Sequence, residues 1–251
     1  MTWNSTMGLI STIALFLPLF LIIALRLSSY RTFPALLVYY FTVFIYNLFT
    51  LGYLKADPQF VHYWGLANNL LDTPLLLTFL IYFSSSTIFT KRIKAAIVAF
   101  VAFEAIVISL FGFTVKAITI ILGPGIAISI VLSTYLFIRH SKITILHRKA
   151  IGKALIAASL LFAYGCYGIL YVLYYVAHTT HIADSFLVYF LIVTISCGML
   201  SAGIILEQKR IRKLHELKIT RKELSNIYSG EKSSIGIPQA VRLDFDRDAW
   251  N

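Results

Sequence analysis

Two carboxyl groups lie inside long apolar stretches of this 251-residue sequence, and they are the side chains best placed to do chemistry. Asp72 and Glu104 each fall near the middle of a stretch long enough to cross a membrane. An ionisable group at that depth costs about 2.5–3.5 kcal/mol, so each one requires an explanation. We expect the two carboxyl groups to stay protonated or to share a proton. They form either a proton-handling or ligand-binding pair, or a pair that ties helices together by hydrogen bonds.

Further polar residues accompany Asp72 along the same stretch. Positions 64, 68 and 72 recur at every fourth residue, which places them on one face of a helix. A proline at position 74 frees a backbone carbonyl one turn earlier. The stripe suits an internal cavity and suits plain helix packing equally well. Its members are Trp64, Asn68, Asn69, Asp72 and Thr73.

A second stripe is made of tyrosines at spacings of three, four and three residues: Tyr164, Tyr167, Tyr171 and Tyr174. Four phenols on one helical face predict either an aromatic pocket for an apolar ligand or ordinary packing. The hydroxyl groups are also candidates to pair with Asp72 or Asn47. Elsewhere, three consecutive residues, Gly123-Pro124-Gly125, predict a break or sharp kink in their helix.

The composition identifies the elements that must position these groups. The chain is 59% hydrophobic and only 13% charged, with a mean hydropathy of +0.80. Soluble domains carry about 25% charged residues, so a water-soluble enzyme, a disordered chain and a disulfide scaffold are excluded. Runs of about 20 apolar residues predict an all-α membrane protein, a bundle of seven transmembrane helices covering residues 1–206. The spans are about 8–25, 33–54, 60–83, 95–115, 117–138, 154–176 and 185–206.

The positive charges predict the orientation of the bundle. Of the 22 lysines and arginines, all but Lys55 and Lys116 fall in alternate connections or in the tail. Because cytoplasmic loops are rich in Lys and Arg, the N-terminus is expected outside and the C-terminus in the cytoplasm. We therefore expect a multi-pass integral protein of the cell (inner) membrane.

The tail, residues 207–251, is predicted to begin as a basic helix that continues the seventh span. From Glu207 to Glu223 it has seven basic and three acidic residues, with a narrow apolar stripe at Ile211, Leu214 and Leu217. Such a helix is expected to lie on anionic lipid headgroups, or alternatively to contact a cytoplasmic protein or a second copy of the chain. No nucleic-acid partner is needed to explain its charge. Beyond Ser225 we expect a flexible segment.

One outer connection holds His178, His181 and Asp184, on the same side as Asp57 and His62. Their spacing matches no strong zinc template, and we interpret them as polar residues at the membrane interface. No metal site and no pairing of a nucleophile with a base is predicted. The expectation is that the protein is not an enzyme.

The residues Asp72-Thr73-Pro74-Leu75-Leu76-Leu77 resemble the third helix of the microbial rhodopsins. Thr73 to Leu77 match the family's Thr-Pro-Leu-Leu-Leu, Asp72 replaces a threonine, and Asn68 falls at the family's carboxylate. Glu104 falls near a helix-four carboxylate of some members, Gly203 to Leu206 resemble the end of helix seven, and Tyr164-Gly165 replaces a Tyr-Pro pair. The resemblance implies a seven-helix bundle with an internal ligand site.

Covalent retinal is excluded despite this resemblance, because span seven contains no lysine to form the imine. The family's helix-three arginine and helix-seven aspartate are missing too. A non-covalent ligand remains open, and no other cofactor is predicted.

We predict a non-enzymatic, rhodopsin-like membrane receptor or sensor. It would bind a small apolar or amphipathic ligand among spans three, five, six and seven, then pass a shift to a cytoplasmic partner. The alternative is a proton or ion translocator that uses Asp72 and Glu104. The candidate site residues are Trp64, Asn68, Asn69, Asp72, Thr73, Glu104, Tyr164, Tyr167 and Tyr171.

Overall fold

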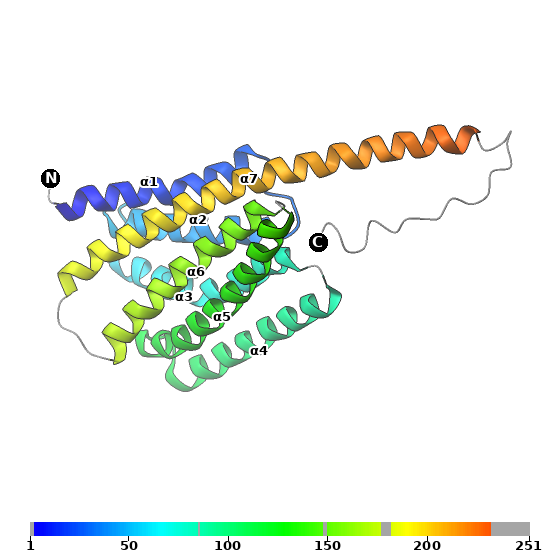
Figure 1. Cartoon of the computed structure of the whole chain (residues 1–251). Coiled ribbons are helices and arrows are strands. Elements are labelled where there is room, and N and C mark those ends of the chain that lie inside the picture. The colour runs from blue at the N-terminus through cyan, green and yellow to red at the C-terminus, as the bar shows by residue number, and fades with distance from the viewer. Residues whose placement is uncertain (1–2, 85, 148–149, 177–181, 232–251) are drawn as a thin grey trace.

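The computed structural model describes residues 3–84, 86–147, 150–176 and 182–231, and these ranges contain helices and no strand. The helices form an elongated bundle from which the last one projects (Figure 1). The long helices are α1 (Trp3–Ala24), α2 (Phe33–Thr50), α3 (Pro58–Leu80), α4 (Thr87–Phe111), α5 (Val115–His147), α6 (Ile151–Tyr171) and α7 (Ile182–Glu231). Two short elements extend α3 and α6: the 3-10 helix η1 (Ile81–Phe83) and the π-helix η2 (Val172–Val176).

The predicted membrane bundle is confirmed, because seven helices are long and apolar enough to cross a membrane. Their outward faces carry large apolar side chains that the fold does not cover. Ile13, Val98 and Val131, for example, are each more than 60% exposed. So much apolar surface is unfavourable in water and favourable against lipid tails.

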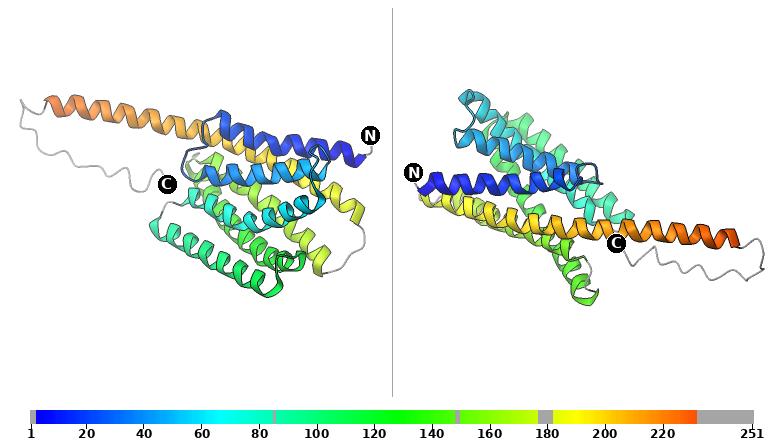
Figure 2. Two further views of the ribbon diagram at one scale, coloured as in Figure 1. Left: turned by 180° about the vertical axis from the view of Figure 1, so that it is seen from behind. Right: turned by 90° about the horizontal axis from the view of Figure 1, so that it is seen from above.

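The seven helices form a closed ring in which sequence neighbours pack side by side. The ring is closed by α7, which packs against both α6 and α1, while α3 also contacts α5 (Figure 2). The main hydrophobic core lies inside the ring, around the C-terminal halves of α1 and α3. It includes Ile22, Phe33, Phe79, Leu136 and Leu200, all fully or almost fully buried.

Several helix boundaries differ from the sequence prediction; α5, for example, ends at His147 instead of near residue 138. α4 begins at Thr87, eight residues before the expected start, because the basic residues of that segment mark the membrane edge and do not stop a helix. It ends at Gly112, whose φ of +69° is a backbone conformation that suits glycine.

The expected break at Gly123-Pro124-Gly125 is absent. α5 continues through this segment as one helix of 33 residues. Within a membrane no water is present to satisfy freed backbone groups, which favours a continuous helix. The glycines instead provide close packing: a Cβ at Gly123 would clash with the Tyr171 hydroxyl, and one at Gly125 would clash with Thr73.

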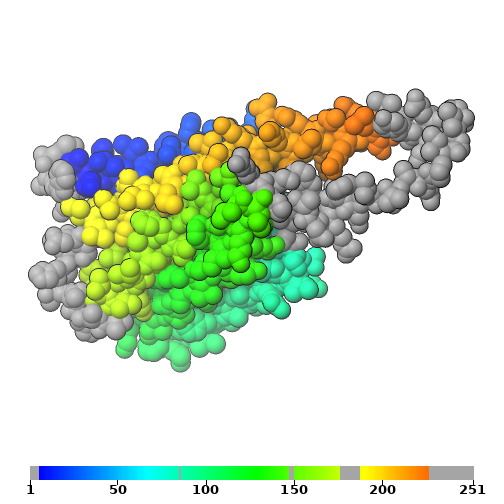
Figure 3. Space-filling model, in the orientation of Figure 1, coloured from blue at the N-terminus to red at the C-terminus, as the bar shows by residue number. Residues whose placement is uncertain are grey.

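Helix α7 continues past the bundle as the tail prediction required. It runs unbroken over 50 residues, and its second half projects beyond the ends of the other helices (Figure 3). Ile211 still packs against the core, but residues 215–225 are all exposed. The expected flexible segment, residues 232–251, lies outside the described residues, and contact of the basic helix with headgroups stays a prediction. We call the end of the bundle from which α7 projects the tail end.

A chain truncated after Leu214 is expected to keep the stability of the bundle. Because residues 215–225 bury no side chain, the truncation should change the unfolding free energy by less than about 0.5 kcal/mol. Unfolding in micelles, followed by tryptophan fluorescence, measures this. A truncation after Leu206 is the contrasting variant, because it also removes buried Glu207; equal losses in the two chains would contradict the boundary at Leu214.

Candidate functional site

The centre of the bundle holds a carboxyl group bound by a phenol. Tyr164 of α6 donates a hydrogen bond from its hydroxyl to Asp72 Oδ1 of α3 at 2.9 Å. Tyr39 of α2 lies beside both groups and interacts with each of them. Pairing of the tyrosine stripe with Asp72 is thereby confirmed, whereas the other candidate partner, Asn47, donates instead to Thr12 Oγ1.

More phenols surround this pair, and they come from three helices. The Tyr167 ring lies 6.0 Å from that of Tyr164 and stacks on Tyr189 of α7 at 5.8 Å. Tyr40 of α2 reaches the thiol of Cys197 on α7. Long tyrosine side chains therefore bridge the centre of the ring, and the only carboxyl group among them is Asp72. We call Tyr39, Tyr40, Asp72, Tyr164, Tyr167 and Tyr189 the tyrosine–aspartate cluster.

Two other residues of the polar stripe, Trp64 and Thr73, contact neighbouring helices outside this cluster. The indole N–H of Trp64 donates to the Thr42 carbonyl of α2 at 3.3 Å, and its ring contacts Phe49 and Phe60. Thr73 is buried against α5, next to Gly125. These two residues therefore join helices and stand beside the cluster, not in it. Asn68 and Asn69 are partly buried.

Tyr171 also leaves the predicted stripe. Its hydroxyl donates to the Thr119 carbonyl of α5 at 3.0 Å, so it ties α6 to α5. Only Tyr164 and Tyr167 of the four tyrosines belong to the cluster around Asp72. The tyrosine stripe therefore changes neighbours along α6: Tyr167 contacts Tyr189 of α7, whereas Tyr171 contacts Thr119 of α5.

Glu104 is separate from Asp72. Glu104 is only 3% exposed. It lies on the same face of α4 as Phe100 and Val107. These two residues pack against Ala117 and Ile121 of α5. Its Oε1 has no hydrogen-bond partner among the described residues. No hydrogen bond joins the two acids in that part of the chain, so the expected pair is not formed.

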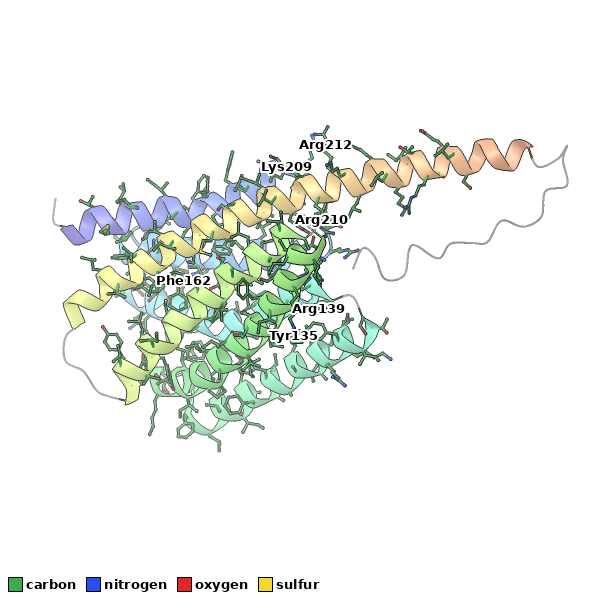
Figure 4. All side chains as sticks on the ribbon, viewed as in Figure 1. Tyr135, Arg139, Phe162, Lys209, Arg210 and Arg212 are labelled. Atoms are coloured by element: carbon green, nitrogen blue, oxygen red, sulfur yellow. The ribbon has the colours of Figure 1, made fainter. Side chains whose placement is uncertain are left out.

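Sequence reasoning missed a second polar cluster, at the tail end. Glu207 of α7 is fully buried and accepts hydrogen bonds from the Tyr82 hydroxyl of η1 and from the guanidinium of Arg210. Arg210 points toward the bundle, whereas Lys209 and Arg212 lie on the opposite side of α7 (Figure 4). The available signal was a glutamate directly after an apolar run, three residues before an arginine. We call Tyr82, His140, Lys153, Glu207 and Arg210 the tail-end cluster.

Comparisons with known proteins do not identify a family for this chain. No protein-family model, no curated protein and no solved structure matches it. The resemblance to microbial rhodopsins therefore stays a prediction.

The described residues contain no group of His, Cys, Asp and Glu side chains that could hold a metal ion. His178 and His181 of the outer connection lie outside the described residues. The described interior therefore offers three carboxyl groups: Asp72 among phenols, Glu207 bound by Tyr82 and Arg210, and Glu104, whose Oε1 has no described partner.

Proposed function

We propose that the protein is a non-enzymatic membrane receptor or sensor that binds a small amphipathic ligand at the tyrosine–aspartate cluster. The observation that carries the proposal is the Asp72 carboxyl group, held by Tyr164 and flanked by phenols of α2, α6 and α7. A carboxylate pairs with a positive head group, and the faces of aromatic rings attract the same charge. The apolar part of the ligand would contact the tyrosine rings.

A route from this site to the tail also supports the receptor proposal. Asp72 and Tyr82 belong to the continuous segment of α3 and η1, and Tyr82 is hydrogen-bonded to Glu207, from which the projecting half of α7 begins. A shift of α3 on ligand binding would therefore displace the base of the projecting helix. The rhodopsin-like character and the cytoplasmic output partner are part of this proposal.

The ligand class is tested with the full chain in nanodiscs, using phenethylamine and phenethyl alcohol, which differ only in their head group. We expect the amine to raise the melting temperature and the alcohol to have a much smaller effect. Asp72→Asn should weaken the apparent affinity for the amine at least about tenfold, because a charge-assisted contact is lost.

Glu104→Gln is the matched control, since it neutralises a buried carboxyl group outside the tyrosine–aspartate cluster and should leave the response to the amine unchanged. Equal responses of the wild type and Asp72→Asn, or equal effects of amine and alcohol, would contradict the proposed site.

A second candidate function, proton or ion translocation, is favoured by one observation. Glu104 Oε1 is buried without a described partner, and intramembrane acids of this kind often belong to ion pathways. Because Asp72 and Glu104 are not joined, translocation would need a relay between them. Proton flux into proteoliposomes, measured with a pH-sensitive dye, tests this function. Flux that is unchanged in Asp72→Asn and Glu104→Gln would remove it.

A further inference from the structure

A buried lysine lies at the tail end of the bundle. Lys153 of α6 is 4% exposed, and its ammonium lies 5.0 Å from the centroid of the Tyr82 ring. No ion pair of Lys153 is formed within the part of the chain that the structure describes. Buried lysines are rare unless they are paired, so this one requires an explanation.

The carboxylate of the tail-end cluster is already occupied. Glu207 Oε2 accepts from Arg210 Nε at 3.0 Å, and Oε1 accepts from Arg210 Nη2 at 2.6 Å and from the Tyr82 hydroxyl. One carboxylate therefore neutralises one guanidinium. Glu207 also lies near Lys153, but among the described residues its oxygens are hydrogen-bonded to Arg210 and Tyr82, so Lys153 has no carboxylate of its own there.

A buried histidine lies next to this lysine. His140 of α5 is 1% exposed, and both of its ring nitrogens lack a hydrogen-bond partner among the described residues. Its ring stands 5.4 Å from that of Phe83, and its charged neighbours are Lys153, Arg139 and Arg210. Buried polar groups are almost always hydrogen-bonded, so an unpartnered imidazole beside three cations suggests a missing acceptor.

We propose that the tail-end cluster binds a phosphate group. Lys153 and His140 would donate to its oxygens, while Arg139 of α5 would add positive charge. A phosphate supplies several acceptor oxygens and negative charge, which Lys153 and His140 lack among the described residues because Glu207 already binds Arg210 and Tyr82. The cluster lies at the ends of membrane-spanning helices, where basic sites between helices meet lipid headgroups. The same chemistry is offered by a phospholipid and by a dissolved phosphate compound.

The test uses the full-length chain in dodecyl maltoside, a detergent without phosphate. One arm titrates inorganic phosphate against chloride at equal ionic strength, and the other titrates phosphatidylglycerol against diacylglycerol in mixed micelles. We expect the melting temperature to rise in at least one arm. A rise with phosphatidylglycerol alone assigns the phosphate to a lipid, and a rise with inorganic phosphate assigns it to a dissolved compound.

Lys153→Met should weaken the apparent affinity in the responding arm by about fivefold or more, the effect of one basic residue near a phosphate surface. Lys209→Met is the matched control, since it removes a charge on the exposed face of α7 and should leave the affinity unchanged. Lys153→Arg should retain binding. If Lys153→Met does not fold, His140→Phe replaces it and should show the same loss.

Two results would overturn the phosphate site. One is an absence of response in both arms. The other is an equal loss of affinity in Lys153→Met and Lys209→Met, which would indicate only a general effect of positive charge.

Discussion

Replacing Glu207 with alanine is expected to destabilise the bundle by about 3 kcal/mol. The substitution leaves the Tyr82 hydroxyl and the Arg210 guanidinium without their shared acceptor. Removing one partner of a buried ion pair costs about 3–5 kcal/mol. We expect the lower end of that range, because the Arg210 side chain is 24% exposed and keeps some access to water.

Unfolding by SDS in mixed micelles measures this loss. Glu216→Ala is the control, since Glu216 pairs with Arg212 on the same helix at 3.3 Å but both side chains are more than 60% exposed. Exposed pairs contribute about 0–1 kcal/mol, so this variant should be close to the wild type. A Glu207→Ala chain as stable as the Glu216→Ala chain would show that the tail-end cluster does not hold α7 to η1.

Gly203→Ala is expected to be the most damaging single-methyl substitution of α7. A Cβ at Gly203 would lie 2.7 Å from Ile156 Cγ1 and 3.0 Å from the Ile156 backbone nitrogen of α6. The two helices must separate to admit it, and overpacking of this kind costs about 1–3 kcal/mol. From the other helix, Gly152→Ala should act similarly, because its Cβ would lie 2.5 Å from the Glu207 backbone nitrogen.

Gly198→Ala, on the same helix, is expected not to destabilise the bundle. A Cβ there meets nothing within 4 Å, so the higher helix propensity of alanine should leave stability unchanged or raise it by up to about 1 kcal/mol. Unfolding of the two variants side by side measures the difference. If Gly203→Ala and Gly198→Ala were equally stable, the close contact of α6 with α7 would be wrong.

The sequence was sufficient to predict the seven helices, because their signal is local. Length and apolar composition decide whether a segment spans a membrane, and all seven predicted spans have a counterpart. Helix ends were less well predicted: the basic residues near Lys91 mark the edge of the lipid, whereas α4 continues through them to Thr87.

The helices that carry Asp72 and Glu104 could be predicted, but the neighbours of the two side chains could not. Position along a helix follows from counting residues, whereas the direction in which each side chain points depends on how the whole helix is rotated. Asp72 faces Tyr39 and Tyr164, and Glu104 shares a face of its helix with Phe100. No local pattern specifies that rotation.

The tail-end cluster was missed for a related reason. Counting Lys153 and Glu207 as loop and tail residues gives the correct number of spans but places the two side chains in solvent. The structure buries both, since α6 begins at Ile151 and α7 continues beyond the apolar run. A charge at the end of a span was therefore assigned to the surface, although it packs between helices.

The most direct test of the tyrosine–aspartate cluster is a double-mutant cycle of Asp72→Asn and Tyr164→Phe, with unfolding measured in the same micelles. If Tyr164 donates to Asp72, we expect a coupling free energy of about 0.6–1.7 kcal/mol, the range found for hydrogen bonds between membrane helices. A parallel cycle of Glu104→Gln with Tyr164→Phe should give no coupling. Additive effects of Asp72→Asn and Tyr164→Phe would contradict the hydrogen bond, and with it the site at the centre of the bundle.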